Sequence, residues 1–369
     1  MTITHLPARR PPFPVLPLRT ALLWALLVIN VPALAAESPS VEAGGGWARA
    51  EPAEVGLDPE SVAAGVEEIG SMPGVRTLLV VADGALVVEE AFGGSGPGNA
   101  DPGAPHNMKS ASKSLLSLLT GIAVEEGKLR GVDERVAPLL GRELAGGREE
   151  IRLRHLLSMS SGLESTSGDG YGAWVSTDDW TAAALGRPLL GPAGEGFRYS
   201  TGNTHLLAAV LERATGDDLL AYARRELFDP LGIGAVSWQE SPEGVRFGGN
   251  NLSMAPRDLA RVGWMLLQGG RWGERQVVPE GWIELSTRQR METPEGWGER
   301  YGDYAWLWWL PRGHGGAYTA VGYGGQFLYV APEAGVAVVL TSTLEGKGTE
   351  WDWKVLEIFH RRFAGAAID

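Results

Sequence analysis

The chain has 369 residues, with 32 lysines and arginines against 45 acidic residues and a formal net charge of −13. Binding to nucleic acid or to an anionic membrane surface needs basic patches, so this acidic balance argues against both kinds of partner. There is no cysteine, which excludes disulfides, thiol nucleophiles and cysteine-ligated metals. The six histidines show no His-Glu-x-x-His pattern, so neither a metal nor another cofactor is expected.

The first 36 residues have the pattern of a targeting segment. Arginines precede an apolar stretch at residues 21–31, and Ala33-Leu34-Ala35 then matches a small-x-small cleavage site. The apolar stretch is short for a membrane span. The pattern predicts a signal peptide at 1–36 and a periplasmic or secreted protein, with an uncleaved N-terminal anchor as the alternative.

Local signals predict the first elements of the mature chain. An Asp-Pro-Glu start favours a helix from Asp58 to Ile69. Two β-rich runs flank Asp83-Gly84, a pair typical of a type I′ hairpin. An apolar helix is expected from about Ser110 to Glu126, ended by a glycine.

The order of the remaining patterns predicts the fold. Residues 131–290 are mostly helical in pattern, including "IRLRHLLSMSSGL" and "NTHLLAAVLERATG". β-rich runs follow, with a hairpin connection at residues 332–335, and a helix closes the chain. We expect an α/β (α+β) domain at 47–369: an antiparallel β-sheet flanked by helices, built from both chain ends, with an inserted helical region at about 131–290.

A serine and a lysine head the apolar helix. Ser110 and Lys113 are three residues apart and so share one face of a helix. A lysine beside a buried core has a lowered pKa and can activate a nearby hydroxyl as a base. Taken alone, the spacing fits equally a capping serine followed by a lysine that reaches solvent.

Two further segments supply polar groups suited to the same chemistry. Tyr199 precedes a helix in "FRYSTGNTHLL", where its hydroxyl can face a cleft, although an ordinary half-buried tyrosine has the same pattern. Tyr323-Gly324-Gly325 stands at the start of a β-rich run, where glycines permit close approach of a ligand or are simply a turn.

Together these segments resemble the serine β-lactamase and penicillin-binding-protein superfamily. The resemblance runs from about residue 47 to residue 343 and is strongest to the class C β-lactamase-like branch, which includes esterases and 6-aminohexanoate-oligomer hydrolases. Its Ser-x-x-Lys is matched by Ser110-Ala111-Ser112-Lys113, its Leu-Leu-x-x-x-Ser-Gly-Leu segment by "LLSMSSGL", and its Tyr-x-Asn by the segment starting at Tyr199. The glycine-containing third motif is matched by "GYGGQFLYVAP".

The resemblance implies a serine hydrolase that forms an acyl-enzyme. Ser110 would attack an acyl carbonyl, while Lys113 and Tyr199 would share the general-base task, in an order that the sequence does not give. The N–H of Ser110 and an N–H from Tyr323 to Gly325 would form the oxyanion hole. The absence of Gly-x-Ser-x-Gly argues against an α/β-hydrolase.

Two departures from the family pattern affect the expected substrate. The asparagine of Tyr-x-Asn is replaced by Thr201, so either Asn203 reaches the site or the asparagine's role is lost. Tyr323 stands where β-lactamases and D,D-peptidases carry a cation that holds a substrate carboxylate, a charged hydrogen bond worth about 1.5–3 kcal/mol. His314 is a candidate replacement for that cation, although the Gly-rich segment around it favours a flexible loop histidine. We expect weak or no β-lactamase activity and a small-molecule ester or amide substrate.

Four loop residues are further candidates for substrate binding: Tyr171, Trp174, Asn250 and Asn251. Each of them also fits an ordinary loop residue without a binding role, which is the more common case. Two other readings stay open. One is a D,D-peptidase-type cell-wall enzyme, and the other is a catalytically silent binding domain of the same fold. The sequence gives neither the natural substrate nor the oligomeric state.

Overall fold

The computed structural model describes residues 46–93, 100–288, 291–343 and 349–366. All of these residues belong to one unit of the chain. The signal peptide expected at residues 1–36 lies outside the described residues and stays a prediction. No helix in the described ranges has both the length and the apolar character that a membrane crossing requires.

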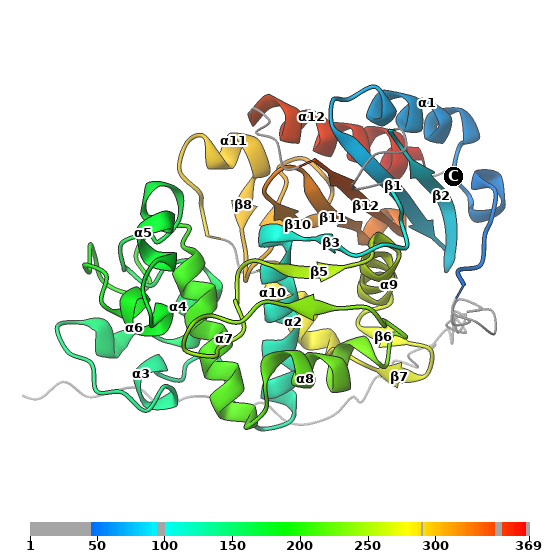
Figure 1. Cartoon of the computed structure of the whole chain (residues 1–369). Helices are drawn as coiled ribbons and strands as arrows, with labels where there is room; N and C mark the ends of the chain where they lie inside the picture. The colour runs from blue at the N-terminus through cyan, green and yellow to red at the C-terminus, as the bar shows by residue number, and fades with distance from the viewer. Residues whose placement is uncertain (1–45, 94–99, 289–290, 344–348, 367–369) are drawn as a thin grey trace, which may run out of the picture. The chain divides into compact units, whose positions relative to one another are not determined.

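A seven-stranded sheet is assembled from both ends of the chain (Figure 1). Every neighbouring pair is antiparallel, which confirms the expected sheet. The strand order is β2-β1-β12-β11-β10-β9-β8. The strands are β1 (Val75–Ala82), β2 (Ala85–Ala91), β8 (Asp303–Tyr304), β9 (Trp309–Leu310), β10 (Tyr318–Gly322), β11 (Gln326–Ala331) and β12 (Val336–Ser342).

The central strands are covered on both faces. β10, β11 and β12 consist of buried residues only, as expected for strands that lack a solvent-facing side. The β1–β2 turn has Asp83 at φ 43° and Gly84 at φ 75°. Two positive φ angles define the expected type I′ hairpin. β1 then pairs with β12, with Val80 opposite Val338, and so joins the two chain ends.

Helices lie on both faces of this sheet (Figure 1). α1 and α12 cover one face, while α9 packs against β1, β11 and β12 on the other, where α2 contacts β10. The helices are α1 (Pro59–Gly70), α2 (Ser112–Glu125), α3 (Val136–Leu139), α4 (Leu153–Leu157), α5 (Tyr171–Val175), α6 (Trp180–Leu185), α7 (Thr201–Thr215), α8 (Leu219–Ala223), α9 (Pro256–Leu267), α10 (Glu280–Arg288), α11 (Trp297–Tyr301) and α12 (Thr349–Ile358).

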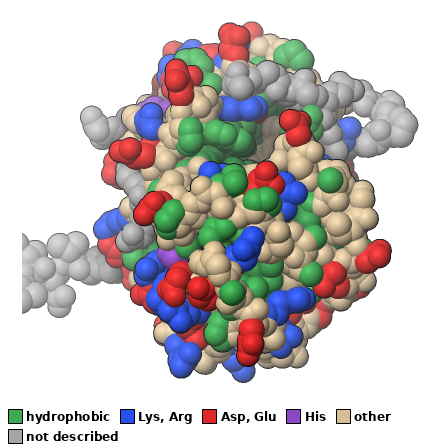
Figure 2. Space-filling model, turned by 90° about the vertical axis from the view of Figure 1, so that its left-hand side faces the viewer, with side chains coloured by type: hydrophobic (Ala, Val, Ile, Leu, Met, Phe, Trp, Pro, Cys, Tyr) green, Lys and Arg blue, Asp and Glu red, His purple; other side chains and the backbone are tan. Residues whose placement is uncertain are grey.

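The helical insertion is shorter than the expected residues 131–290. Helices α3 to α8 form it, but α9 lies against the sheet, so the insertion ends before Pro256. The remaining short strands form two small sheets, β3-β5-β4 and β6-β7. Their bounds are β3 (His106–Asn107), β4 (Ser237–Trp238), β5 (Leu252–Met254), β6 (Arg271–Trp272) and β7 (Arg275–Gln276). On the face toward the insertion, acidic and basic side chains are interspersed (Figure 2).

The segment "IRLRHLLSMSSGL" is less helical than its pattern suggests. Only the five residues of α4 are helical. The backbone leaves the helix because Met159 has a φ of 57° and Gly162 a φ of 79°. At Gly162 a Cβ would lie 2.2 Å from the carbonyl oxygen of Gly191, so the chain turns there against another loop. Apolar periodicity alone does not reveal such a tertiary contact.

Helix α2 is the buried axis of the molecule. Every residue from Ser112 to Ala123 is buried, so the helix is packed on all sides. Ser110 lies just before it, in the 3-10 turn Lys109–Ala111. After the helix ends, Gly127 adopts a φ of 67°, the left-handed conformation expected of the closing glycine.

Candidate active site

Ser110 and Lys113 face each other at the start of α2. Lys113 Nζ lies 3.0 Å from Ser110 Oγ. The lysine side chain is buried, at 1% exposure, and this burial lowers its pKa to about 7. An amine with such a pKa is partly unprotonated at neutral pH and can accept the serine proton. The alternative of a lysine reaching solvent is therefore excluded by the structure.

Two other groups fix the position of the lysine amine. Lys113 Nζ donates a 2.7 Å hydrogen bond to the carbonyl oxygen of Gly249 and lies 3.4 Å from Thr201 Oγ1. A Cβ at Gly249 would come within 2.8 Å of Nζ, so only glycine permits this approach. The amine is thus held toward Ser110 by groups from two other segments.

Tyr199 completes the polar group around the serine. It precedes α7, forms a side-chain hydrogen bond with Ser110, and has its ring centroid 5.2 Å from Lys113 Nζ. Burial raises the pKa of Tyr199 to about 12, although the bond to Ser110 opposes the rise. The phenol is therefore protonated at neutral pH, which makes Lys113 the better base of the two.

The end of β10 lies directly against the serine turn. A Cβ at Gly322 would lie 2.2 Å from the carbonyl oxygen of Met108 and 3.2 Å from the nitrogen of Ala111. Tyr323, Gly324 and Gly325 form the turn between β10 and β11 instead of beginning a strand. This contact brings the backbone of the turn beside the backbone of Ser110, where an oxyanion hole would have to form.

A cavity of about 760 Å³ opens over Ser110. Its lining comes from the serine turn, the α5 loop, the β4–β5 loop, α11, the sheet edge and α12. The lining residues are Lys109, Ser110, Ser167, Gly168, Tyr171, Tyr199, Thr201, Asn250, Asn251, Trp297, Arg300, Tyr301, Trp309, Val321, Tyr323, Gly324 and Asp352.

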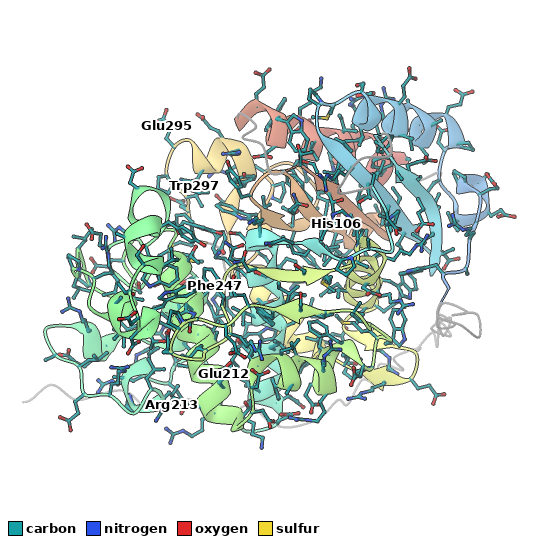
Figure 3. The ribbon with its side chains drawn as sticks, viewed as in Figure 1. His106, Glu212, Arg213, Phe247, Glu295 and Trp297 are labelled. Atoms are coloured by element: carbon teal, nitrogen blue, oxygen red, sulfur yellow. The ribbon has the colours of Figure 1, made fainter. Side chains whose placement is uncertain are left out.

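Aromatic rings form one wall of this cavity. Trp297 stacks on Tyr199 at a centroid distance of 5.2 Å and on Trp309 at 5.4 Å with an interplanar angle of 8°. Trp297 lies on α11 and is 39% exposed, so it stands at the cavity's edge (Figure 3). Such a wall suits an apolar or aromatic part of a ligand.

The charged groups of this wall neutralise each other. Arg300 Nε donates to Asp352 Oδ2 at 2.7 Å, and the Tyr301 hydroxyl donates to the same oxygen at 2.7 Å. Burial and the Asp352 charge raise the pKa of Tyr301 well above its usual value. Arg300 therefore presents a paired guanidinium to the cavity.

The candidate substrate-binding residues divide into two groups. Tyr171, Asn250 and Asn251 line the cavity, and Asn250 Nδ2 donates to the Tyr171 hydroxyl at 3.0 Å. Trp174 is buried behind Tyr171, where its indole N–H donates to the carbonyl oxygen of Trp180 at 2.9 Å. Trp174 therefore supports the wall and does not face a ligand.

Asn203 is a correction to the expected site. It is buried in α7, where its Oδ1 accepts a 2.8 Å hydrogen bond from Ser161, and it is not among the cavity-lining residues. Thr201 instead occupies the side facing Lys113, because Asn203 lies two residues farther along the helix. Gly325 also faces away: a Cβ there would lie 2.5 Å from the Trp351 ring.

His314 is not a replacement cation for the cavity. It is buried at 6% exposure, and its ring stacks on His360 at 4.3 Å. Burial lowers its pKa, and neighbouring His360 acts in the same direction. Among the residues that the structure describes, the cations that line the cavity are Lys109 and the paired Arg300.

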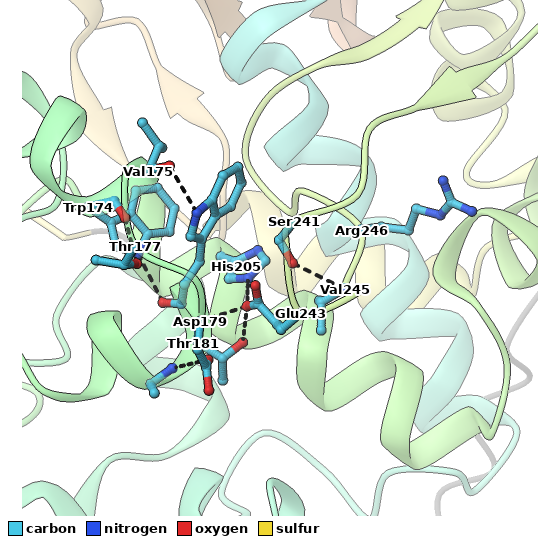
Figure 4. Close-up of polar contacts among 12 residues, drawn as sticks. Trp174, Val175, Thr177, Asp179, Thr181, His205, Ser241, Glu243, Val245 and Arg246 are labelled. Carbon is cyan, nitrogen blue, oxygen red and sulfur yellow. Dashed lines mark hydrogen bonds and ion pairs between the residues drawn. The ribbon is translucent and has the colours of Figure 1, made fainter.

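A partly buried carboxylate anchors the loop that carries Gly249 and Asn250. Glu243 Oε1 accepts hydrogen bonds from His205 Nε2 at 3.0 Å and from Thr181, through its backbone nitrogen at 2.9 Å and its hydroxyl at 3.0 Å (Figure 4). Burial would raise the pKa of Glu243, but these hydrogen bonds outweigh it and hold the pKa well below the usual range. The anchored loop can then present its carbonyl to Lys113.

Several of these site residues have no local sequence pattern that marks them. Gly249 contributes only its backbone carbonyl, and Arg300 and Asp352 are separated by 52 residues. Trp297 and Trp309 could have been suspected only from the tryptophan-rich composition. Among residues 46–93, 100–288, 291–343 and 349–366, no three His, Asp or Glu side chains are grouped so as to hold a metal ion.

The fold, with Ser110, Lys113 and Tyr199 together beside the sheet edge, defines a serine β-lactamase/transpeptidase-like protein. The beta-lactamase family profile matches residues 61–357, and the chain belongs to this family.

The relatives of the chain include hydrolases. The 6-aminohexanoate-dimer hydrolase of Paenarthrobacter ureafaciens is 29% identical over 262 residues, which cover 64% of this chain and 66% of that protein. The match thus spans slightly less than two thirds of that relative's length. Protein flp of Staphylococcus aureus (strain COL) is 26% identical over 180 residues, covering 47% of this chain and 36% of that protein.

Solved structures of the same fold include enzymes of several kinds. EstCE1, described as a hydrolase with promiscuous acyltransferase activity, superposes with a TM-score of 0.65 at 18% identity, covering 82% of this chain and 99% of EstCE1. The simvastatin synthase LovD of Aspergillus terreus gives a TM-score of 0.64 at 19% identity, covering 83% and 96% of the two chains. At this identity the likeness shows the fold alone.

Proposed function

We propose that the protein is a serine hydrolase that forms an acyl-enzyme on Ser110 and hydrolyses an ester or an amide. The observation that carries this proposal is the 3.0 Å contact between Ser110 Oγ and the buried amine of Lys113. A hydroxyl beside a base of pKa about 7 is an activated nucleophile. The hydrolase names of the relatives support the same reaction class.

The reaction follows from the arrangement of these groups. Lys113 accepts the Ser110 proton as Oγ attacks the acyl carbonyl, and the hydrogen bond between Tyr199 and Ser110 orients the serine. The N–H of Ser110 and an N–H of the Tyr323–Gly325 turn stabilise the developing oxyanion. The leaving group departs with a proton, and water then attacks the acyl-enzyme with Lys113 again as the base.

Covalent labelling tests this proposal. A fluorophosphonate probe is expected to add once to the protein, on the peptide that contains Ser110, as seen by mass spectrometry. Ser110→Ala should abolish the adduct and the hydrolysis of p-nitrophenyl butyrate. Ser117→Ala is the matched control, because this buried serine of α2 has no hydrogen-bond partner within the described ranges. A wild-type protein that forms no adduct on Ser110 would overturn the proposal.

The cavity favours a substrate that has no carboxylate beside the third motif, the Tyr323–Gly325 turn. Tyr323 is 63% exposed there, and Arg300 is paired with Asp352. Aromatic rings supply much of the remaining wall, so a neutral ester or amide with an apolar group fits best. The D,D-peptidase alternative requires recognition of a terminal carboxylate and is less well supported for this reason.

Hydrolysis of nitrocefin, a β-lactam, tests the expected weak β-lactamase activity. We expect its kcat/KM to lie at least about tenfold below that for p-nitrophenyl butyrate, the factor corresponding to loss of one charged hydrogen bond. Equal or faster nitrocefin hydrolysis would contradict the expectation. Lys109→Met would then show whether Lys109, which lines the cavity beside Ser110, holds the carboxylate instead.

A further inference from the structure

Two hydroxyl groups extend from the lysine amine to the cavity. Thr201 Oγ1 lies 3.4 Å from Lys113 Nζ, and Ser167 Oγ lies 3.0 Å from Thr201 Oγ1. Both residues line the cavity. The three groups therefore form a continuous line of polar contacts that ends at the space where a substrate would bind.

The hydrogen-bonding capacity of the neutral amine gives this line a direction. An uncharged lysine has two N–H donors and one lone pair. The carbonyl oxygen of Gly249 can only accept, so it takes one N–H. If the lone pair faces the Ser110 hydroxyl, the second N–H faces Thr201 Oγ1. The amine is then fully satisfied in the state that can accept the serine proton.

The same count applies to the two hydroxyls. Ser167 Oγ accepts a 2.9 Å hydrogen bond from the backbone nitrogen of Thr201, which leaves it one lone pair and one O–H. The lone pair can accept the Thr201 hydroxyl proton. Within the described part of the chain, Ser167 Oγ has no acceptor other than Thr201, so its own O–H is available to a ligand in the cavity.

We infer that Thr201 and Ser167 form a hydroxyl relay that returns the proton of Ser110 to the leaving group during acyl transfer. The inference rests on the proposed function. In this relay Thr201, which stands at the family's asparagine position, passes a proton from Lys113 to Ser167. Ser167 becomes the group that contacts the leaving atom.

The proton transfers balance. As Ser110 Oγ bonds to the acyl carbon, its proton moves to Lys113 Nζ. When the bond from that carbon to the leaving atom breaks, the leaving atom keeps the electron pair and takes the Ser167 hydroxyl proton. Ser167 then receives the Thr201 proton, and Thr201 receives one from Lys113. The amine is neutral again, and both hydroxyls are restored.

A merely structural role for Ser167 is the competing explanation, because Ser167 also caps the first turn of α7 through the Thr201 nitrogen. Leaving-group dependence separates the two roles. p-Nitrophenolate departs readily as an anion and needs no proton, whereas an alkoxide leaving group depends on one. A relay defect therefore affects alkyl esters selectively, while a disturbed fold affects both kinds of ester.

The test compares benzyl butyrate with p-nitrophenyl butyrate through kcat/KM. Ser167→Ala and Thr201→Val are each expected to lower the benzyl ester value by about tenfold or more and to leave the p-nitrophenyl value within about twofold. Thr201→Ser keeps the hydroxyl and should retain both rates. Ser176→Ala is the matched control, because this exposed serine hydroxyl donates to the Gly172 carbonyl and has no other hydrogen bond among the described residues.

Three results would overturn the relay. The first is a loss by Ser167→Ala that is equal on both esters, and the second is no loss on the benzyl ester. The third is a selective loss of kcat/KM on the benzyl ester in Tyr199→Phe alone, which would assign the return of the proton to the tyrosine. Fluorophosphonate titration counts the folded active sites of each variant. A wild-type protein that forms no adduct on Ser110 would contradict the proposed function itself. An active wild-type protein whose Ser167→Ala variant keeps the same kcat/KM ratio between the two esters would contradict only the relay.

Discussion

Replacing Lys113 with methionine is expected to lower kcat/KM for ester hydrolysis by about 10²- to 10⁴-fold, the usual contribution of a general base. Methionine has a similar length and no amine, so it removes the amine beside Ser110, the proposed base, while filling the same buried space. The measurement is steady-state hydrolysis of p-nitrophenyl butyrate. Lys128→Met, at an exposed position just after α2, is the matched control and should keep the wild-type rate.

The pH dependence tests whether Lys113 is the base. Because burial lowers the pKa of Lys113 to about 7, the wild-type kcat/KM should fall as the pH drops through that value and the amine becomes charged. Lys113→Met should lack this acidic limb. A variant that keeps the wild-type rate or the same limb would refute Lys113 as the base and leave Tyr199 as the candidate.

The same substitution should stabilise the fold at low pH. Below pH 7 the lysine is charged in both states, and the folded state bears the full cost of burying the ammonium. Between about 7 and 10.5 the unfolded chain binds more protons than the folded one, so the wild-type free energy of unfolding rises with pH. The advantage of Lys113→Met should therefore be largest below pH 7 and shrink above it, as thermal unfolding across pH would show.

Local sequence signals were sufficient where a few neighbouring residues determine the backbone. Asp83-Gly84 predicts its hairpin because both residues tolerate positive φ angles. The apolar run after Ser110 predicts α2 and places the lysine one turn from the serine. The prediction of a sheet built from both chain ends also held, because β1 and β12 are apolar runs that need partners.

The rest of the site depends on contacts that no local pattern encodes. The Gly249 carbonyl reaches Lys113 because Glu243 anchors its loop to His205 and Thr181. The sequence showed that Thr201 replaces an asparagine, but not that Ser167, 34 residues earlier, lies beside its hydroxyl. Asn203 was a candidate because it is close in sequence to Tyr199. Helical geometry turns its side chain toward Ser161 instead.

The contact between β10 and the serine turn predicts a second large effect. Gly322→Ala should lower kcat/KM by about 100-fold, the cost of moving a reacting group by about 1 Å. A Cβ at Gly322 would lie 2.2 Å from the Met108 carbonyl oxygen and 3.2 Å from the Ala111 nitrogen. Both of these atoms belong to the backbone, so they cannot move aside without shifting the turn that holds Ser110. The measurement is kcat/KM for p-nitrophenyl butyrate together with the rate of fluorophosphonate labelling.

Loss of stability has to be distinguished from displacement of the serine. Gly281→Ala is the control, since a Cβ there meets no atom within 4 Å, and it should leave both activity and thermal unfolding close to wild type. Gly263→Ala in α9 is a second comparison, because its Cβ would press on the side chains of Ala337 and Leu328 in the sheet and not on the serine turn. If both Gly322→Ala and Gly263→Ala unfold at lower temperature, only Gly322→Ala should label slowly while folded. A folded Gly322→Ala variant with wild-type labelling would show that the serine turn and the β10 edge are not rigidly coupled, and the oxyanion hole would then have to draw its second N–H from elsewhere.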